Sequence, residues 1–510
     1  MEVTVNLPMR EWYAYDLDYW GLDYPPLMAY AEWLLGHASR LVDPASVALD
    51  ASRGYETPGH RAFMRGTVIL CDALFFVLPL ALLHGRLLRR RTRRAGHCDA
   101  DDQSSSSTSS VLLRMTEGHG ALASLAVAVL SPAPILVDHG HFQYNCVPLG
   151  LTLWTAYAVA TDRPCVAAAC FSLACNAKQT ALYFAPAVFF ELLAGCWTDG
   201  PEGSSTQTVA GSVQRLARVG ATTIATFGAC WAPLLAGGGA FDCARRLFPV
   251  DRGVFEDKVG NVWYAAQVVF RARDRLDQST LVAAAAALTF ATAVVPCAAA
   301  AWLRVVRSPK KRRRRRRDAD FLKALHVSAL GFFLCSYHVH EKAILVPLAP
   351  LLAYRFSTRS FFSLRDAYVV GFHVAAAFSI LPLLCFERLR LAYAATMVLF
   401  AVLLDAVFFS TGHVAKSSSS ALVSMTWLFR GASLAFAGLH AAPLVVAPPT
   451  RFPDLFHALT ALGSAGAFGL AYLLALADLL LGDDEPPSPG DEDRRAPGTT
   501  TTTTTRAKAE

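Results

Sequence analysis

Apolar runs of the length that crosses a membrane recur along this chain and alternate with polar segments. A helix of about 17 to 25 apolar residues is long enough to span the hydrocarbon core of a bilayer. The middle runs are short and contain prolines, so broken or re-entrant helices are an alternative there. About thirteen spans are expected, near residues 66–88, 117–137, 147–160, 164–178, 180–196, 216–236, 280–305, 320–337, 343–356, 366–386, 389–410, 421–446 and 456–482.

The polar segments divide the chain into parts. Residues 1–65 are polar, aromatic and proline-containing, and 240–279 is a further polar stretch. The last residues are rich in Asp, Glu, Pro and Thr, a composition that cannot bury a core. We therefore expect an all-α polytopic membrane protein with a loop segment at 1–65, a multispanning domain at 66–482 with cytosolic linkers at 95–112 and 306–319, and a disordered tail at 483–510.

Composition and charge favour a membrane protein. The 510 residues are 54% hydrophobic and only 17% charged, which is more apolar than a soluble core of this length needs. The net charge of +7 comes largely from basic clusters at 86–94 and 304–317. Basic residues beyond a span favour the cytosolic side. A nucleic-acid patch is the alternative for 312–317, but its place between two hydrophobic helices argues against a nucleic-acid partner.

The 12 cysteines include no Cys-x-x-Cys pair and no His/Cys cluster with metal-ligand spacing. Several lie inside apolar runs, among them Cys71, Cys170 and Cys230. We expect them to pack within the helices rather than to form disulfides or bind a metal. No metal and no other cofactor is expected.

Alternation of the spans brings four polar segments to one membrane face. With both basic clusters in the cytosol, residues 1–65 face the opposite side, which is the lumen if the membrane is that of the endoplasmic reticulum. The segments Glu11–Tyr30, Asp138–Asn145, Phe248–Trp263 and His338–Lys342 then lie on that side. Convergence of segments that are distant in sequence is typical of an active site.

The segment Glu11–Tyr30 concentrates acidic and aromatic side chains and contains the pair Pro25-Pro26. Because prolines resist helix formation, we expect an extended or turned loop. Aromatic faces stack on sugar rings and carboxylates accept hydroxyl protons, so the loop suits sugar recognition. A surface loop anchored by its aromatics is the alternative. The candidate sugar-binding residues are Asp16, Asp18, Trp20, Asp23 and Tyr24.

The segment DHGHFQYN concentrates hydrogen-bonding groups where a helix is expected to leave the membrane. Two histidines two residues apart, without further spaced ligands, are weak grounds for a metal site. A polar loop that positions a sugar or a helix is preferred. Its candidate residues are Asp138, His139, His141 and Gln143.

The remaining two segments carry charged groups. Acids and bases alternate in 248–263, which indicates either a site that uses Arg252 or a solvated, ion-paired loop. His338, His340 and Lys342 lie between two apolar spans, where ionisable groups are costly. Two imidazoles and an ammonium can bind a phosphate group. Snorkelling of Lys342 to the membrane interface is the alternative.

Several motifs, in order along residues 1 to about 355, resemble a known family. They are YWGLDYPPL, SRGYE, DHGHFQYN, NAKQTALYFAP, FPVDRGVFEDKV and HVHEKAIL. These motifs resemble the endoplasmic-reticulum α-1,3-glucosyltransferases of asparagine-linked glycan assembly. Within that family, DRGVFEDK and HGHFQYNC resemble the enzyme that adds the first glucose more than the sister enzyme that adds the second.

The resemblance implies a GT-C membrane fold, dolichyl-phosphate-glucose as donor and a nine-mannose dolichyl-pyrophosphate-linked oligosaccharide as acceptor. A lumenal carboxylate would act as general base on an acceptor hydroxyl, which attacks the β-linked glucose and gives an α-1,3 linkage. The dolichyl phosphate leaving group needs charge stabilisation. The resemblance implies this role for His340 and Lys342, with His338 and Arg252 also at the phosphate. The polyprenyl tails would lie in the lipid bilayer between spans.

One departure from the family concerns the base. In the family, an acidic motif with the expected base, preceded by a spanning helix, stands directly before the segment that opens this chain. Met1 and Glu2 follow that position immediately, so base and helix would lie upstream of the printed sequence. Asp23 matches a second family acid and, with His340, is the candidate catalytic residue here.

Two other functions are alternatives to the active enzyme. An inactive, truncated paralogue would explain the departure. A transporter would predict charged residues within the spans and internal repeats. Charges lie mainly at the span ends and no repeat is evident, so a transporter is the least favoured.

Overall fold

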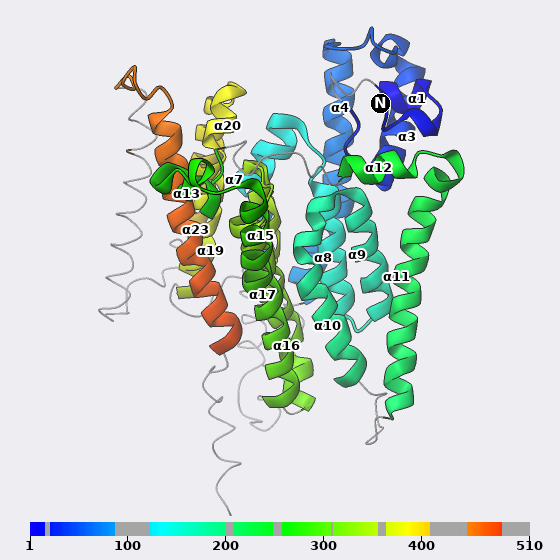
Figure 1. Cartoon of the computed structure of the whole chain (residues 1–510), viewed down its shortest axis with the longest axis vertical. Coiled ribbons are helices and arrows are strands. Elements are labelled where there is room, and N and C mark those ends of the chain that lie inside the picture. The colour runs from blue at the N-terminus through cyan, green and yellow to red at the C-terminus, as the bar shows by residue number, and fades with distance from the viewer. Residues whose placement is uncertain are drawn as a thin grey trace, which may run out of the picture.

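The computed structural model is an elongated bundle of helices. Its described residues are 1–15, 21–86, 122–198, 208–247, 258–307, 310–354, 364–408, 438 and 446–481. Within these ranges every regular element is a helix, as the apolar pattern predicts. Figure 1 shows long helices side by side along the long axis, with short helices gathered at one end. We call that end, which carries α1 (Glu2–Asn6), α3 (Pro26–Val42) and α12 (Ala240–Leu247), the capped end.

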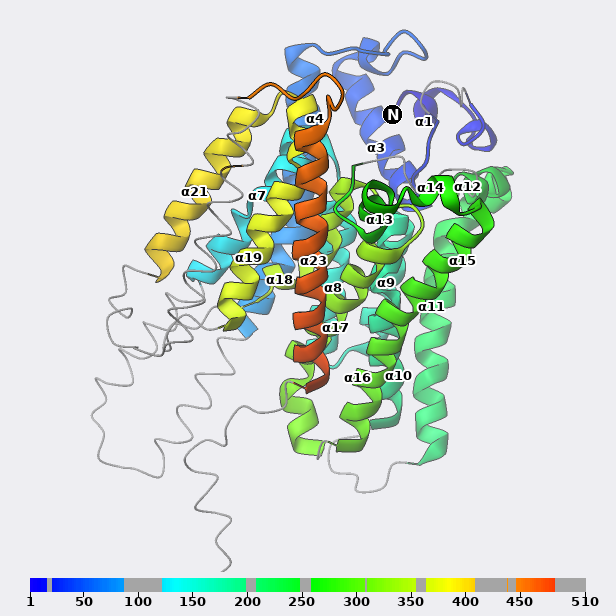
Figure 2. The ribbon, with the colours of Figure 1, turned by 60° about the vertical axis from the view of Figure 1, so that its left-hand side comes forward.

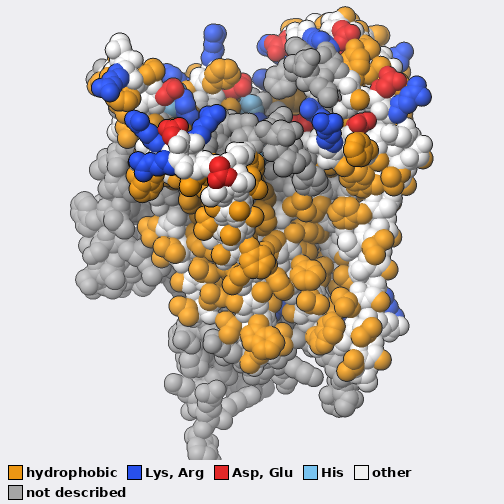
Figure 3. Space-filling model, in the orientation of Figure 1, with side chains coloured by type: hydrophobic (Ala, Val, Ile, Leu, Met, Phe, Trp, Pro, Cys, Tyr) orange, Lys and Arg blue, Asp and Glu red, His pale blue; other side chains and the backbone are white. Residues whose placement is uncertain are grey.

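Six helices in the described chain are long and apolar enough to cross a membrane, and each falls on an expected span. Figure 3 shows hydrophobic side chains over the sides of the bundle and charged side chains gathered at the capped end. This distribution suits a bundle whose sides face lipid. The six are Pro58–Arg86, Leu122–Phe142, Gln179–Trp197, Val209–Gly237, Gln278–Val306 and Leu455–Leu481.

Several of the other expected spans are shorter or interrupted. Two of them are the short apolar helices α8 (Cys146–Ala160) and α9 (Pro164–Ala177). The run at 366–386 divides at Ile380, because Pro382 in the first turn of the next helix cannot continue the preceding one. The span expected near 421–446 lies outside the described residues except for residue 438 and its last position. The total of about thirteen spans stays a prediction.

The other helical elements of the described chain follow in chain order. They are η1 (Met9–Glu11), η2 (Pro44–Val47), α4 (Pro58–Cys71), η3 (Asp72–Val77), α7 (Pro132–Pro134), η4 (Ile135–Phe142), η5 (Gln179–Phe184), α10 (Ala185–Thr198), α11 (Val209–Gly237), α13 (Val262–Phe270), α14 (Ala272–Arg275), α15 (Gln278–Thr289), η6 (Phe290–Val294), α16 (Val295–Arg307), α17 (Lys310–Cys335), η7 (Glu341–Ile344), α18 (Leu345–Leu352), α19 (Leu364–Ser379), α20 (Leu381–Phe386), α21 (Arg390–Phe408) and α23 (Leu455–Leu481). The segments η3, η4 and η6 are π-helical.

The prediction that Pro25-Pro26 keeps the opening segment out of a helix is wrong from Pro26 onward. Pro26 is the first residue of α3. A proline is tolerated at the first helical position, because its missing N–H has no partner there in any case. The Tyr30 hydroxyl of α3 donates to the carbonyl oxygen of Cys230 in α11, at 2.9 Å. The opening segment is therefore attached to the end of a long helix.

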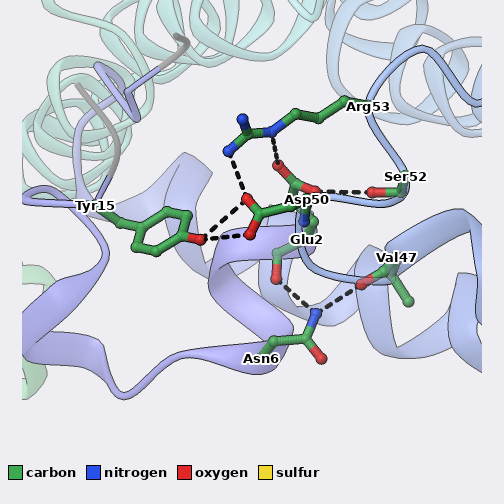
Figure 4. A network of polar contacts seen from close by, with 7 residues as sticks. All are labelled: Glu2, Asn6, Tyr15, Val47, Asp50, Ser52 and Arg53. Atoms are coloured by element: carbon green, nitrogen blue, oxygen red, sulfur yellow. Dashed lines mark hydrogen bonds and ion pairs between the residues drawn. The ribbon is translucent and has the colours of Figure 1, made fainter. Parts of the chain in front are cut away.

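Polar contacts hold the opening segment against the turn that follows α3 (Figure 4). The Tyr15 hydroxyl donates to Asp50 Oδ2 at 2.9 Å, and Arg53 Nη2 lies 2.5 Å from Asp50 Oδ1. The Ser52 hydroxyl donates to Glu2 Oε2 at 2.8 Å. Residues Glu2, Tyr15, Asp50 and Arg53 thus join two parts of the segment 1–65.

The expected polar stretch 240–279 is largely helical where it is described. It contains α12, α13 and α14. Asn261 caps α13, since its Oδ1 accepts from Tyr264 N at 2.9 Å. The Trp263 indole N–H donates to the carbonyl oxygen of Cys335 at the end of α17, 2.9 Å away. The aromatic residue that closes the predicted motif therefore holds α13 against the bundle.

Glycines permit the closest helix contacts in the core. A Cβ added to Gly150 of α8 would lie 2.1 Å from the carbonyl oxygen of Phe75 in η3. One added to Gly331 of α17 would lie 2.6 Å from the carbonyl oxygen of Thr292 in η6. Only a residue without a side chain allows such approaches. Both π-helical segments are thereby packed into the centre of the bundle.

Candidate functional site

The structure describes nine of the thirteen candidate site residues. Asp16, Asp18, Trp20 and Arg252 lie outside the described residues. The described nine come from three parts of the chain, which are the approach to α3, the η4 segment and the connection between α17 and η7. They are Asp23, Tyr24, Asp138, His139, His141, Gln143, His338, His340 and Lys342.

Asp138 begins the motif DHGHFQYN and is buried, with 4% of its surface exposed. Its Oδ1 accepts from Asn145 N at 3.2 Å and from Asn145 Nδ2 at 2.8 Å, and its Oδ2 accepts from Cys146 N at 2.7 Å. These backbone donors are at the start of α8, where N–H groups lack partners within the helix. The carboxylate therefore anchors the first turn of α8.

The two histidines of the motif contact different elements. His139 Nε2 lies 3.5 Å from Asp72 Oδ2 in η3, and His141 Nδ1 lies 3.2 Å from Glu387 Oε1 after α20. A partly enclosed pocket beside the first pair is lined by Asp72, Asp138 and His139. Among the described residues, no three potential metal ligands come together. The two histidines therefore connect η4 to η3 and to the residue after α20.

Asn145 and Gln143 extend the network to a lysine at the end of α9. Lys178 Nζ donates to Asn145 Oδ1 at 2.7 Å and to Gln143 Oε1 at 3.2 Å. Asn145 Nδ2 also donates to Gln143 Oε1 at 3.1 Å. Asp138, Asn145, Gln143 and Lys178 therefore form one hydrogen-bonded network between α8 and α9.

Lys178 connects this network electrostatically to the other candidate segments. Burial, together with the positive charge of Lys342, lowers the pKa of its ammonium to about 8. The carboxylates of Asp138 and Asp23 act in the opposite direction. Three of the predicted segments thus lie within electrostatic reach of Lys178.

The motif HVHEK follows the end of α17. The rings of His338 and His340 pack edge to face with their centroids 4.8 Å apart. Lys342 is half-buried in the short helix η7, and Val339 between the histidines is buried. The two histidines therefore pack against each other beside the buried Val339.

Tyr24 and Asp23 precede α3. The Tyr13 hydroxyl donates to the carbonyl oxygen of Tyr24 at 2.8 Å. Burial raises the pKa of the Tyr24 hydroxyl, and the neighbouring carboxylates of Asp23, Glu32 and Asp138 raise it further. The Tyr24 side chain thus lies in a partly buried, negatively charged environment.

The described end of the motif FPVDRGVFEDKV forms a surface ion pair. Lys258 Nζ lies 2.7 Å from Asp454 Oδ1, and this lysine lowers the pKa of the Asp454 carboxyl. The contact matches the solvated, ion-paired alternative for this one residue. Residues 248–257 lie outside the described part of the chain.

Four residues of the networks were missing from the sequence-based candidates. Asp72 and Lys178 carried a signal, because each is a single charge next to or inside an apolar run. Asn145 carried a weaker one as the last residue of DHGHFQYN. Nothing local marks Glu387, whose partner His141 is 246 residues away.

Comparisons with known proteins identify a family that covers most of the chain. Residues 1–474 match the model of the ALG6, ALG8 glycosyltransferase family. A chicken (Gallus gallus) protein named dolichyl pyrophosphate Man9GlcNAc2 alpha-1,3-glucosyltransferase is 33% identical, over 89% of this chain and 84% of its own length. The Saccharomyces cerevisiae protein of the same name is 32% identical, over 89% and 80% respectively. A Drosophila melanogaster relative, named a probable enzyme of this type, is 33% identical over 92% and 88%.

Proposed function

Because this chain belongs to the ALG6, ALG8 glycosyltransferase family, we propose that it transfers glucose in α-1,3 linkage onto the nine-mannose dolichyl-pyrophosphate oligosaccharide of protein N-glycosylation. The donor in this proposal is dolichyl-phosphate-glucose. The names of the relatives support the acceptor and the linkage. The observation that carries the proposal from the structure is the hydrogen-bonded network that joins Lys178 to Gln143 and Asn145, where Asp23 and Lys342 act electrostatically on the same ammonium.

The proposal includes a GT-C fold with about thirteen spans in the endoplasmic-reticulum membrane, with the capped end in the lumen. Six helices of spanning length support a bilayer location. Arg307 ends α16 and Lys310 begins α17, so the connection between these helices lies at the end of α17 opposite Cys335. Cys335 contacts α13 through Trp263. Positive residues on the far side of the bundle suit a cytosolic orientation of that end.

In the proposed reaction, the acceptor hydroxyl oxygen bonds to C1 of glucose while the bond from C1 to the phosphate oxygen breaks. The electron pair of the broken bond goes to dolichyl phosphate, and the hydroxyl proton goes to a carboxylate base. His340 and Lys342, with His338 and Arg252, stabilise the charge that develops on the phosphate. Asp23 is the candidate base among the described residues. Attack from the opposite face converts the β-linked glucose into an α-linked product.

The sugar-binding candidates have two kinds of role in this proposal. Asp16, Asp18, Trp20 and Tyr24 contact sugar from the segment before α3. The other candidates hold the site in position, because their polar atoms bond to protein groups in η3, in α8 and after α20. They are Asp138, His139, His141 and Gln143.

Acceptor choice tests the proposal against the sister enzyme, which adds the second glucose. The full-length protein in lipid nanodiscs is incubated with dolichyl-phosphate-glucose and either the nine-mannose acceptor or its monoglucosylated form. We expect glucose transfer to the first acceptor alone. Transfer only to the monoglucosylated acceptor would assign the chain to the sister activity, and transfer to neither would contradict the enzyme.

The variant His340→Ala links that activity to the site. Removal of one group that stabilises developing charge lowers kcat by about 100-fold in other enzymes. Lys323→Gln is the matched control, since Lys323 Nζ pairs with Asp478 Oδ2 at 3.0 Å between α17 and α23, away from the site network. Unchanged kcat in His340→Ala would remove this residue from the proposed site.

A further inference from the structure

Lys178 is a charged residue that the proposed mechanism does not yet use. It follows the last residue of α9, where the backbone turns extended, with φ −152° and ψ 133°, before η5 begins. The junction lies between two apolar helices, one of them part of the spanning segment Gln179–Trp197. A lysine at such a junction is costly unless its charge has a use.

The ammonium of Lys178 is fixed without a direct carboxylate contact. Its two side-chain hydrogen bonds in the described structure go to the neutral amide oxygens of Asn145 and Gln143. Among the described residues, no Asp or Glu oxygen lies within ion-pair distance of it, since Asp138 already accepts three hydrogen bonds from Asn145 and Cys146. An ammonium has three donors, so one N–H remains for a further acceptor.

A second cation, Lys342 of η7, acts electrostatically on this one. The charge of Lys342 opposes protonation of Lys178, and His141 interacts electrostatically with both lysines. The anionic groups that face Lys178 are Asp138, which belongs to the network, and Asp23. Two like charges held together in a half-buried site repel each other unless an anion lies between them.

We propose that Lys178 is a further binding residue for the phosphate of dolichyl-phosphate-glucose and shares this phosphate with Lys342. This inference rests on the proposed function and adds a residue to its donor site. Gln143 and Asn145 hold the ammonium in place, and Asp138 holds Asn145. The buried network thereby fixes the position of a charge that contacts substrate.

The pH dependence of donor binding tests this role in the intact protein. Dolichyl-phosphate-glucose is a phosphodiester with one negative charge throughout the range, so any titration belongs to the protein. With the pKa of Lys178 at about 8, a site that needs the protonated lysine loses about tenfold in donor affinity between pH 7 and pH 9. Binding is measured without acceptor, by the change in tryptophan fluorescence of the protein in nanodiscs.

Two variants separate this role from a purely structural one. In Lys178→Arg the charge persists at all pH values used, so the loss of affinity between pH 7 and pH 9 should disappear. Lys178→Gln should raise Kd and KM for the donor by about 10- to 100-fold, the effect of losing a charge-assisted hydrogen bond, with KM for the acceptor unchanged. Lys323→Gln, the control, should change neither constant.

The outcomes distinguish this inference from the proposed function. Donor affinity that is independent of pH in the wild type, or equally dependent in Lys178→Arg, would overturn the role of Lys178. A rise in the acceptor KM alone in Lys178→Gln would also overturn it. In each of these cases, glucose transfer by the wild type would leave the proposed function intact. If the wild type does not bind the donor at any pH, both proposals are contradicted.

Discussion

Asp138 offers the sharpest test of whether the DHGHFQYN motif positions the site or contacts substrate. Its carboxylate is 4% exposed and accepts three hydrogen bonds, two from backbone N–H groups at the start of α8. A hydrogen bond to a charged group contributes about 1.5–3 kcal/mol, and truncation leaves buried donors unsatisfied. We expect Asp138→Ala to lower the free energy of unfolding by about 3–5 kcal/mol, with partial overlap between the three contacts.

Asp138→Asn should cost less, about 1–3 kcal/mol, because one amide oxygen can still accept while the NH₂ group faces a donor. Thermal unfolding of the purified protein in nanodiscs gives the stability of each variant, and glucose transfer per folded molecule gives its activity. Asp274→Asn is the control, since this exposed aspartate in α14 has no side-chain hydrogen bond in the described structure. If Asp138→Asn is as stable as the wild type but inactive, the carboxylate acts on substrate and the positioning role is refuted.

Three further predictions concern separate parts of the molecule. Gly150→Ala should destabilise the protein by about 1–3 kcal/mol, because its Cβ would meet the Phe75 carbonyl oxygen at 2.1 Å. Gly228→Ala, which has open space around it, is the control and should not destabilise the protein. Equal melting temperatures of the two variants would contradict the packing of α8 on η3. Asp277 caps α15, and hydrogen bonds from Ser279 and Thr280 lower its pKa to about 2. Because this folded pKa lies below the ordinary value, the cap stabilises the folded protein above about pH 4, and this stabilisation is lost as the pH falls toward 2. Asp277→Ala should therefore be less stable than the wild type at pH 6 and equal to it near pH 2. A difference in stability that is independent of pH would refute the cap. His338→Ala should raise the donor KM by about tenfold or more while leaving the melting temperature unchanged within a few degrees; the reverse pattern would make His338 a packing residue.

The positions of the long helices could be predicted from the sequence because a spanning helix is a local property. A long run of apolar residues is enough to indicate a helix that lies in lipid, and all six helices of spanning length were expected. The failure at Pro26 and the helices found in the polar stretch 240–279 also have local reasons. A proline that cannot continue a helix can begin one, and a polar stretch on an interface can be helical when one face packs, as Trp263 does against Cys335.

The candidate site could be predicted only as a set of segments. The motifs gave the residue types that converge, but the partners of those residues depend on contacts across the fold. His141 meets Glu387, and His139 meets Asp72, through packing that no spacing along the chain reports. Both histidines were candidate sugar-binding residues, and the structure gives each of them a carboxylate partner. Lys178 lies within the motif NAKQTALYFAP, but only its hydrogen bonds to Gln143 and Asn145 connect it to the candidate site.

The chemical outcome of one reaction tests the central claim most directly. Purified full-length protein is incubated with dolichyl-phosphate-glucose and the nine-mannose lipid-linked acceptor, and the product oligosaccharide is analysed by mass spectrometry and by NMR of the new anomeric proton. We predict one added hexose with an α-1,3 linkage and release of one dolichyl phosphate for each glucose transferred. A β-linked product, or an acceptor left unchanged while donor is present in excess, would contradict this account.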